Sequence, residues 1–353
     1  MKKRTCVLVT GAGALLGQGI LRCLQEERLK YRIVTADPDF RSSGHWLGDK
    51  ACYLPPAKSQ DYLDELKKII LAEKVEFILV GTDVELPILA ANRSALKHSL
   101  GVNVVISPSS VIEIANNKWL TAEFLRTSSF PYPVSALATE HEQVKQRFGS
   151  GPFPLIAKPV DGARSKGLRR INSISDLAEI LNLPGSLVVQ EFLPEDEGEF
   201  TAGCLVFNGK CYAAVVMRRD LRDGNTYRAY SDITSRFDKF ISKVAEKLGV
   251  EGPCNFQFRI RNGEPVIFEI NARFSGTTPL RLIFGFNEVA AVLDYYISGV
   301  VPEQPKILSG VVLRTYSDVF IDRNQFEKFR EEQELEKPRF TEFTFSMKKI
   351  VNE

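Results

Sequence analysis

Hydrophobic positions in the first third of the chain alternate between the strand period and the helix period. Short β-branched runs predict strands at Thr5–Thr10, Arg32–Ala36, Glu76–Val80 and Val104–Ser107, and apolar residues at helical spacing predict helices over Leu15–Leu24 and Asp61–Ala72. The glycine turn Gly11-Ala12-Gly13 separates the first strand from the first helix. Strands that alternate with helices favour a parallel sheet, so residues 1–110 are expected to form an α/β domain.

The pattern changes to antiparallel strands with helices in the rest of the chain. Asn208-Gly209 and Arg261-Asn262-Gly263 are turn signals that predict two hairpins, over Glu199–Arg218 and over Cys254–Ile270. Further helices are predicted at Asn117–Ser128 and Ser235–Leu248, and further strands at Phe153–Pro159 and Ser186–Phe192. The expected fold is therefore a parallel α/β domain followed by an α+β region, with a ligand cleft between them.

Charge and cysteine usage exclude several classes of function. Lysine plus arginine (46) against aspartate plus glutamate (44) leaves a net charge of +2, which gives no electrostatic case for nucleic acid or a membrane surface. The six cysteines form no C-x-x-C pair, so a zinc site is not expected and buried free thiols are. Met1–Gly19 is basic and then apolar, but its four glycines fit a strand–turn–helix rather than a leader peptide. A soluble, cytoplasmic protein is expected.

Three oxygen donors in the stretch Asn255–Thr278 indicate a metal site. Glu269 and Asn271 are two residues apart on a predicted strand, so their side chains leave the same face, and Gln257 lies on the preceding hairpin strand. Such donors suit Mg²⁺, which completes its shell with water and substrate phosphates. Arg273 comes two residues later and could reach a phosphate oxygen. A surface strand whose polar face meets water would carry the same pattern, but Phe268, Ile270 and Phe274 are expected to anchor this strand in a core.

The sequence from Glu269 to Gly276 resembles the metal-binding strand of the ATP-grasp family, especially its carbamoyl-phosphate-synthase-like branch. The other motifs of the family follow in their usual order over residues 110–290, and they are Asn117-Lys118 with Phe130–Pro133, Leu155–Pro159, Asp161–Gly167, Val189–Leu193 and Gly198–Thr201. Asn117 stands where the family more often has Asp, and Arg164 and Lys166 replace small residues in the phosphate-covering loop.

The resemblance implies an ATP-grasp fold with a Rossmann-like domain at 1–110, linker helices and a small lid subdomain at 111–186, and a large subdomain at 187–353. It implies an ADP-forming ligase that binds ATP and Mg²⁺ (or Mn²⁺), activates a small carboxylate as an acyl phosphate and passes it to an amine. Homodimers are common in this family. The residues that the resemblance assigns to ATP are Lys118, Lys158, Ser165, Gln190, Glu191, Phe192 and Glu199. It assigns the metal to Gln257, Glu269 and Asn271, and catalysis to Arg273, Lys158 and Arg218.

Three further features of the sequence bear on ligand binding, namely an arginine-rich segment, the glycine turn and residues 82–85. Arg218 lies in an arginine-rich segment with Arg219, Arg222 and Arg228, which is either a site for a substrate carboxylate or a solvated basic loop. The glycine turn after the first strand, with Asp37 at the end of the second, has G-x-G-x-x-x-G spacing and is similar to a dinucleotide turn. Residues 82–85 end the third strand, where they either line a pocket or begin a helix.

Four functions remain open from the sequence. The leading one is a carboxylate–amine ligase in peptide, natural-product or surface-polysaccharide tailoring. The others are activation of bicarbonate or a carbamate, an NAD-dependent reductase built on the glycine turn, and a nucleotide-binding regulator without turnover. The presence of Gln257, Glu269, Asn271 and Arg273 together argues against the last.

Overall fold

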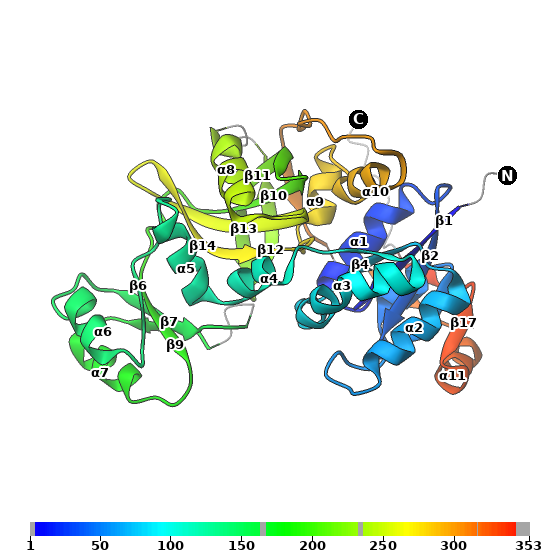
Figure 1. Ribbon diagram of the computed structural model, residues 1–353, viewed down its shortest axis with the longest axis horizontal. Helices are drawn as coiled ribbons and strands as arrows, with labels where there is room; N and C mark the ends of the chain where they lie inside the picture. The colour runs from blue at the N-terminus through cyan, green and yellow to red at the C-terminus, as the bar shows by residue number, and fades with distance from the viewer. Residues whose placement is uncertain (1–3, 163–166, 232–235, 316, 344–353) are drawn as a thin grey trace, which may run out of the picture. The chain divides into compact units, whose positions relative to one another are not determined.

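The protein divides into two compact units (Figure 1). The computed structural model describes residues 4–162, 167–231, 236–315 and 317–343. Unit 1 holds the residues up to Glu85, Ser94–Val104 and those from Leu313 onward, and unit 2 holds Leu86–Arg93 and Val105–Val312. Helix α3 (Leu86–Leu100) is shared between them.

Unit 1 is built on a six-stranded sheet whose strand order is β17-β3-β2-β1-β4-β5. Its strands are β1 (Thr5–Thr10), β2 (Tyr31–Asp37), β3 (Lys50–Tyr53), β4 (Phe77–Val80), β5 (Asn103–Val105) and β17 (Glu334–Glu336). Its helices are α1 (Leu15–Gln25), α2 (Tyr62–Glu73), α11 (Arg323–Glu332) and the short 3-10 helices η1 (Ser43–Leu47) and η2 (Asp83–Glu85). The strands β3, β2, β1 and β4 run parallel, which confirms the expected parallel α/β domain.

The end of the chain returns to unit 1, which differs from the expected assignment of 187–353 to one subdomain. Strand β17 pairs antiparallel with β3, and the ammonium of the buried Lys50 on β3 lies 3.0 Å from carboxylate oxygens of both Glu334 and Glu336 on β17. Burial alone would lower the pKa of Lys50, but these carboxylates raise it above its ordinary value. Strands β16 (Asp318–Phe320) and β18 (Thr341–Phe343) form a second antiparallel pair, and both also belong to unit 1.

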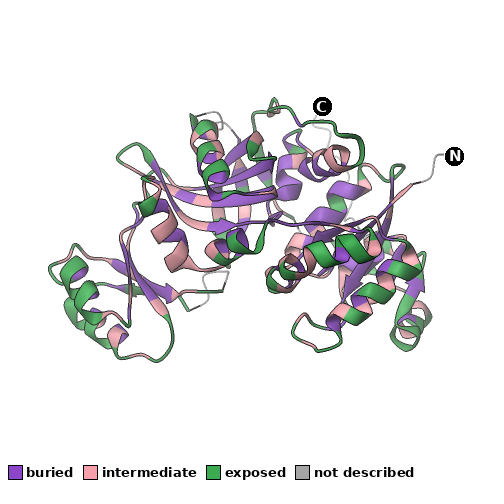
Figure 2. Ribbon diagram, viewed as in Figure 1, coloured by how far each residue is buried: buried purple, intermediate pink, exposed green. Residues whose placement is uncertain are grey.

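Unit 2 contains a small four-stranded antiparallel sheet. Its order is β6-β9-β7-β8, from β6 (Ser135–Leu137), β9 (Leu187–Glu191), β7 (Leu155–Pro159) and β8 (Arg169–Ile171). Helices α6 (His141–Phe148) and α7 (Ile174–Leu181) close its core, in which Val144, Phe148 and Leu177 are buried. Figure 2 shows the buried strands of this sheet beside helices whose outer faces are exposed.

A larger six-stranded sheet forms the rest of unit 2, in the order β14-β13-β10-β11-β12-β15. Its strands are β10 (Glu199–Phe207), β11 (Lys210–Arg222), β12 (Asn225–Tyr230), β13 (Gly252–Arg261), β14 (Glu264–Asn271) and β15 (Val311–Leu313). The helices of this part are α4 (Ser109–Asn116), α5 (Lys118–Thr127), α8 (Asp238–Leu248), α9 (Thr278–Ile283) and α10 (Glu288–Ser298). Helix α8 packs on β10 and β11, while α4 and α5 contact β14. Both predicted hairpins are confirmed.

Each of these hairpins contains one extra residue that changes its register. Next to the turn Phe207 pairs with Lys210, but beyond a bulge at Leu205/Val206 the ladder pairs Glu199 with Arg219. In the second hairpin Phe258 pairs with Ile267, whereas Gln257 pairs with Glu269, so Phe268 is the extra residue. Because side chains alternate between faces, one added residue moves all later side chains of a strand to the opposite face. The bulges therefore decide which side chains share the face on which Gln257 lies.

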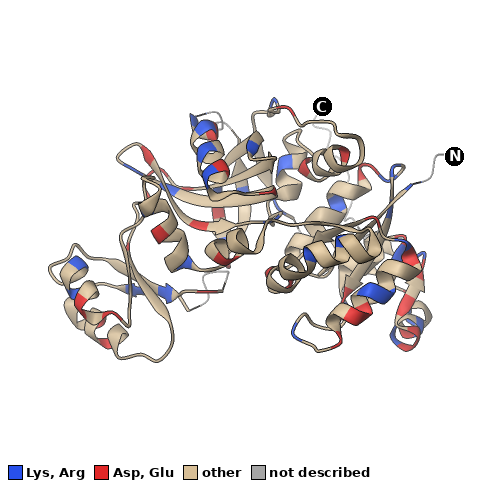
Figure 3. Cartoon of the chain, viewed as in Figure 1, with Lys and Arg blue, Asp and Glu red and all other residues tan. Residues whose placement is uncertain are grey.

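Charged residues of both signs are mixed along the surface helices, as Figure 3 shows for α8 and α11. This mixture agrees with the near-neutral balance of the whole sequence. Among the described residues, no helix combines the length and the apolar character that crossing a bilayer requires.

A buried carboxyl group of unit 1 predicts a pH-dependent stability. Glu85 accepts hydrogen bonds from the hydroxyls of Thr10 at 2.8 Å and Tyr62 at 2.7 Å, and burial raises its pKa from 4.5 to about 7. A raised carboxyl pKa means that the folded state holds the proton more tightly, so stability is complete below about pH 4.5 and falls as pH rises to about 7. This shift corresponds to about 3 kcal/mol. We expect Glu85→Gln, which cannot ionise, to lose less stability over this range.

Urea unfolding at the two ends of that pH range measures the effect. The unchanged protein should lose about 3 kcal/mol more of its free energy of unfolding than Glu85→Gln does when the pH rises from the acidic to the neutral end. Asp61→Asn serves as the control because this carboxylate is exposed on the same unit. A difference that is independent of pH would contradict the role given to Glu85.

Candidate active site

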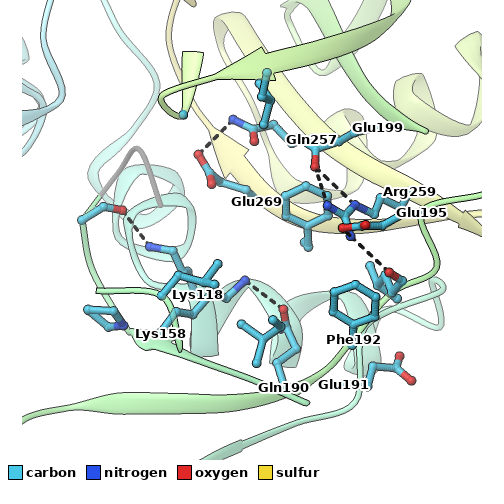
Figure 4. Close-up of a pocket in the computed structure, with 18 of the residues that line it drawn as sticks. Lys118, Lys158, Gln190, Glu191, Phe192, Glu195, Glu199, Gln257, Arg259 and Glu269 are labelled. Carbon is cyan, nitrogen blue, oxygen red and sulfur yellow. Dashed lines mark hydrogen bonds and ion pairs between the residues drawn. The ribbon is translucent and has the colours of Figure 1, made fainter. Parts of the chain in front are cut away.

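A cavity of about 240 Å³ lies in unit 2, lined by strands of both its sheets (Figure 4). The small sheet contributes Lys158 and Gln190, and the large sheet contributes Glu199, Gln257 and Glu269. Positive side chains therefore face carboxylates and an amide across one enclosed space. Such convergence of polar groups in a concave pocket is typical of a ligand site.

Lys118 reaches the cavity from the first residue of helix α5. The side chain of Asn117 caps this helix by accepting hydrogen bonds from the backbone N–H groups of Trp119 and Leu120, at 3.0 and 3.1 Å. Asn117 thus does what an aspartate would do at this position. The N–H of Lys118 donates to the carbonyl of Val160 at 2.8 Å, which ties the start of α5 to the end of β7. The Lys118 ammonium donates to the carbonyl of Gly162 at 2.7 Å.

Lys158 is buried on strand β7 and is held by a polar relay. Its ammonium donates to Oε1 of Gln190 at 2.8 Å, and Nε2 of Gln190 donates to the hydroxyl of Ser135 at 2.8 Å. Burial lowers the pKa of Lys158 to about 8, against the opposing effect of the Glu269 carboxylate. The backbone of Gln190 lies in the ladders that join β9 to β6 and to β7, so its side chain is the part that reaches Lys158. In this structure the Gln190 side chain fixes the position of Lys158.

The three predicted metal donors come together on the face of the large sheet. Oε1 of Glu269 accepts hydrogen bonds from the amide of Gln257 at 3.0 Å and from the amide of Asn271 at 2.9 Å. Nη2 of Arg273 donates to Oδ1 of Asn271 at 2.9 Å, and Nη1 donates to the carbonyl of Phe274 at 3.1 Å. Asn271 and Arg273 are thus joined to the cavity wall through Glu269.

The donor set fits Mg²⁺ better than a softer ion. It offers one carboxylate and two amide groups, and Mg²⁺ is usually bound by one or two carboxylates with water and substrate phosphates completing its shell. Within the described ranges, no group of three or more His, Cys, Asp and Glu residues is arranged to hold a metal by itself. A metal at Glu269 would therefore depend on phosphate oxygens for part of its coordination, and the same oxygen donors suit Mn²⁺.

Glu199 lies between two arginines at the other end of the cavity (Figure 4). Its Oε1 accepts from Nη2 of Arg219 at 2.6 Å, and its Oε2 accepts from Nη2 of Arg259 at 3.0 Å. The Arg259 guanidinium also pairs with Glu195 at 3.0 Å and donates to the carbonyl of Leu193 at 3.1 Å. These contacts link the large sheet to the segment that follows β9.

The segment at the end of β9 contains Glu191 and Phe192, which the family resemblance assigns to ATP. Oε1 of Glu191 accepts from the N–H of Val134 at 3.0 Å and forms an ion pair with Arg261, so this side chain holds neighbouring backbone in place. The ring of Phe192 lies 4.6 Å from the guanidinium of Arg170. Phe192 and Leu193 both line the cavity and give this end an apolar wall.

Among the described residues, three predicted site residues do not line the cavity themselves, and they are Arg218, Asn271 and Arg273. Ser165 lies outside the described residues. Arg218 points away from the cavity, where its guanidinium stacks on Tyr230 at 3.9 Å and lies 3.7 Å from Asp220. Its neighbour Arg219 lines the cavity instead, because the ladder pairs Arg219 with Glu199 and Arg218 with Phe200.

Several residues that line the cavity are not among the predicted site residues, and they include Arg219, Arg259 and Phe268. Arg259 follows Gln257 by two residues on β13, so strand alternation alone would have put both on one face. Phe268 was expected to anchor β14 in a core, but the bulge turns it to the cavity, where the Lys158 ammonium lies 5.7 Å from its ring. A bulge of this kind has no clear signal in a single sequence.

The glycine turn of unit 1 is filled by the chain itself. Both oxygens of Asp37 are engaged, because Oδ2 accepts from the N–H of Gly13 at 2.8 Å and Oδ1 accepts from the hydroxyl of Ser42 at 2.7 Å. A Cβ on Gly13 would lie 2.0 Å from that hydroxyl oxygen, and one on Gly44 would lie 1.8 Å from the carbonyl oxygen of Ala12. The glycines here allow close packing of residues 42–44 on the turn, and Asp37 accepts hydrogen bonds from the backbone of Gly13 and the hydroxyl of Ser42.

Residues 82–85 form the approach to helix α3. The hydroxyl of Thr82 accepts from the N–H of Val84 at 3.1 Å, and Glu85 is buried against Thr10 and Tyr62. The alternative that these residues begin a helix is thus the one that the structure supports.

Two separate segments of the chain match models of known families. Residues 184–319 match the family described as ATP-grasp in the biosynthetic pathway with Ter operon, and residues 7–105 match the PylC-like N-terminal domain. The large chain of carbamoyl phosphate synthase from Campylobacter jejuni is 22% identical over 304 residues, which are 79% of this chain and 27% of that protein. This chain thus spans about a quarter of the length of the curated relatives it matches.

Solved structures share the fold at low sequence identity. N5-carboxyaminoimidazole synthetase from Staphylococcus aureus, complexed with ADP, superposes with a TM-score of 0.66 at 14% identity, over 94% of this chain and 86% of that one. L-amino acid ligase from Bacillus licheniformis superposes with a TM-score of 0.65 at 18% identity, over 84% of this chain and 75% of that one. The chain thus contains an ATP-grasp domain, matched over residues 184–319, after a PylC-like N-terminal domain, and it has the carbamoyl phosphate synthase large chain among its relatives.

Proposed function

We propose that the protein is an ATP- and Mg²⁺-dependent carboxylate–amine ligase that works through an acyl phosphate. The observation that carries this proposal is that Lys118 and Lys158 line one cavity together with Gln257 and Glu269, and that Glu269 is hydrogen-bonded to Asn271. Cations on one side and hard oxygen donors on the other match the needs of a metal-bound triphosphate.

The lysines would bind the phosphates of the nucleotide, and the apolar end of the cavity would bind its base. Lys118 and Lys158 supply ammonium groups for phosphate oxygens, and Gln190 holds Lys158 in place through a 2.8 Å hydrogen bond. Phe192 and Leu193 offer the apolar surface for a base, and Glu199 lies where a ribose would extend from it. Ser165 stays a prediction for the phosphate-covering loop.

The reaction would proceed in two displacements. A substrate carboxylate oxygen attacks the γ-phosphorus and ADP leaves, and then an amine nitrogen attacks the acyl carbon and inorganic phosphate leaves. Mg²⁺, when bound, supplies neutralisation of the charge that develops on the phosphoryl oxygens. Glu269, fixed by the amides of Gln257 and Asn271, would hold that charge centre, and Arg273 would steady the transferred group.

The substrate is proposed to be an amino acid or another small carboxylic acid, with an amine as acceptor. One of the similar structures is named an L-amino acid ligase, which supports this choice. A second candidate is activation of bicarbonate or a carbamate, because the curated relatives are carbamoyl phosphate synthase large chains. The reductase interpretation loses support because both oxygens of Asp37 are bound to Gly13 and Ser42.

Glu269→Ala tests the metal assignment. This change removes the single carboxylate of the metal cluster, so we expect phosphate release from ATP to fall by at least about 10²-fold while the fold survives. The measurement is phosphate release over pairs of amino acids, small acids and bicarbonate with amines, at fixed Mg²⁺. A selective pair would distinguish the ligase from the bicarbonate-activating alternative.

Glu264→Ala is the matched control, because this exposed carboxylate lies on the same strand, beside the hairpin turn. It should release phosphate at the rate of the unchanged protein. If a folded Glu269→Ala protein keeps that rate as well, the metal assignment is rejected.

The low pKa of Lys158 predicts a pH-dependent nucleotide affinity. Its pKa of about 8 means that the ammonium is charged below this pH and increasingly neutral above it. Phosphate binds the charged form, so ADP affinity should fall by up to about tenfold per pH unit above about pH 8. Lys158→Arg keeps its charge at all these pH values and should give a flatter profile. Calorimetric titration of ADP from about pH 7 to about pH 9.5 measures this, and parallel profiles for the two proteins would contradict it.

A further inference from the structure

Seven side chains on the cavity face form one continuous chain of hydrogen bonds and ion pairs. The chain runs across β13, β10, β11 and β14, and its members in order are Arg259, Glu199, Arg219, Gln257, Glu269, Asn271 and Arg273. One end therefore reaches the segment after β9 through Arg259, and the other end reaches the proposed metal donors. Arg219 is the member that joins the two ends.

Arg219 holds two acceptors with one nitrogen. Its Nη2 lies 2.6 Å from Oε1 of Glu199 and 2.6 Å from Oε1 of Gln257, while Nη1 donates to the hydroxyl of Thr226 at 3.3 Å. The side chain is 8% exposed, and a guanidinium presents its donors in a rigid fork. Its position is thus fixed by Glu199 on one side and by Thr226 on the other.

The contact with Arg219 determines which way the amide of Gln257 faces. An amide has one acceptor oxygen and one NH₂ donor group. Because the oxygen faces Arg219, the NH₂ group faces Glu269, to which it donates at 3.0 Å. The orientation of the Glu269 carboxylate, the single acid among the proposed metal donors, therefore depends on Arg219 through Gln257.

We propose that Arg219 is a positioning residue that couples the nucleotide end of the cavity to its metal end. This inference rests on the proposed function, since it requires that Mg²⁺ and a nucleotide bind here. Arg219 keeps Gln257 turned so that Glu269 is aligned before the metal arrives. Residues that orient a metal ligand in this way typically change metal affinity by about 10- to 100-fold when they are replaced.

Arg259 provides a matched comparison. It pairs with the same carboxylate as Arg219, through Oε2 of Glu199 at 3.0 Å, and is also part of the cavity wall. Its other contacts include Glu195, the carbonyl of Leu193 and the rings of Phe192 and Phe268, and none of these is with Gln257. Replacing Arg259 removes one positive charge beside Glu199 and leaves the link to Gln257 in place.

The test measures ADP affinity by calorimetry, once with a chelator and once with saturating Mg²⁺, in three proteins. In the unchanged protein Mg²⁺ should increase ADP affinity. Arg219→Met should reduce this Mg²⁺-dependent gain by about tenfold or more. Arg259→Met should weaken ADP binding with and without Mg²⁺ and keep the gain. Equal gains in all three proteins, or equal losses of gain in both variants, would overturn the role of Arg219.

A second pair of variants addresses the route and guards against misfolding. In a Gln257→Leu background, Arg219→Met should cause no further loss of the Mg²⁺-dependent gain, because Arg219 acts through Gln257; additive losses contradict that. Arg219→Lys keeps the charge beside Glu199 and repeats the test if the methionine variant does not fold. Absence of ADP binding by the unchanged protein would reject the proposed function itself, whereas a normal gain in Arg219→Met or Arg219→Lys would reject only the coupling.

Discussion

The register of two hairpins is the constraint on which the cavity depends. An unbroken ladder from the Phe207–Lys210 pair would place Arg218 opposite Glu199, and one from the Phe258–Ile267 pair would place Phe268 opposite Gln257. One extra residue in each hairpin instead brings Arg219 to Glu199 and Glu269 to Gln257. Without these bulges, the carboxylate and the guanidinium would leave the face on which the amide of Gln257 lies.

Burying many charges on one sheet face costs free energy unless each charge is paired. On this face, each charged or amide group contacts the next one along the sheet. Arginine and carboxylate alternate at one end, and amides separate Glu269 from Arg273 at the other. Beyond them the fully buried ion pair of Arg281 and Glu288, at 2.7 Å, lies over β10. A Cβ on Gly203 would lie 2.4 Å from the Arg281 guanidinium carbon, so the glycine of this strand makes room for the ion pair. Breaking such a buried pair leaves an uncompensated charge, which explains why the face is organised as a connected network.

Periodicity and turn residues predicted helices α1, α2, α5 and α8, strands β1, β2, β4, β5, β7 and β9, and both hairpins, because these depend on local spacing. The same signals predicted that Gln257, Glu269 and Asn271 lie close together, because the i, i+2 relation and the hairpin turn are visible in the sequence. The choice of Arg218 over Arg219 could not be corrected in this way, because a one-residue bulge leaves no periodic signal. The return of β17 to β3 was equally hidden, since a three-residue strand is too short for a pattern and is held by the contacts of Lys50 with Glu334 and Glu336.

The glycine turn of unit 1 shows that one sequence motif is compatible with two roles, the binding of a ligand and the packing of the protein on itself. A dinucleotide turn uses glycines so that a pyrophosphate can approach the backbone, and an acid at the next strand end to bind a ribose. Here the same residue types let Ser42 and Gly44 approach the backbone, and Asp37 ties that loop to Gly13. The spacing of the glycines indicates only that some group comes close to the backbone. Residues 42–44, which lie outside the motif, decide whether a ligand or the protein itself occupies this position, and in this chain they bring the protein itself against the turn.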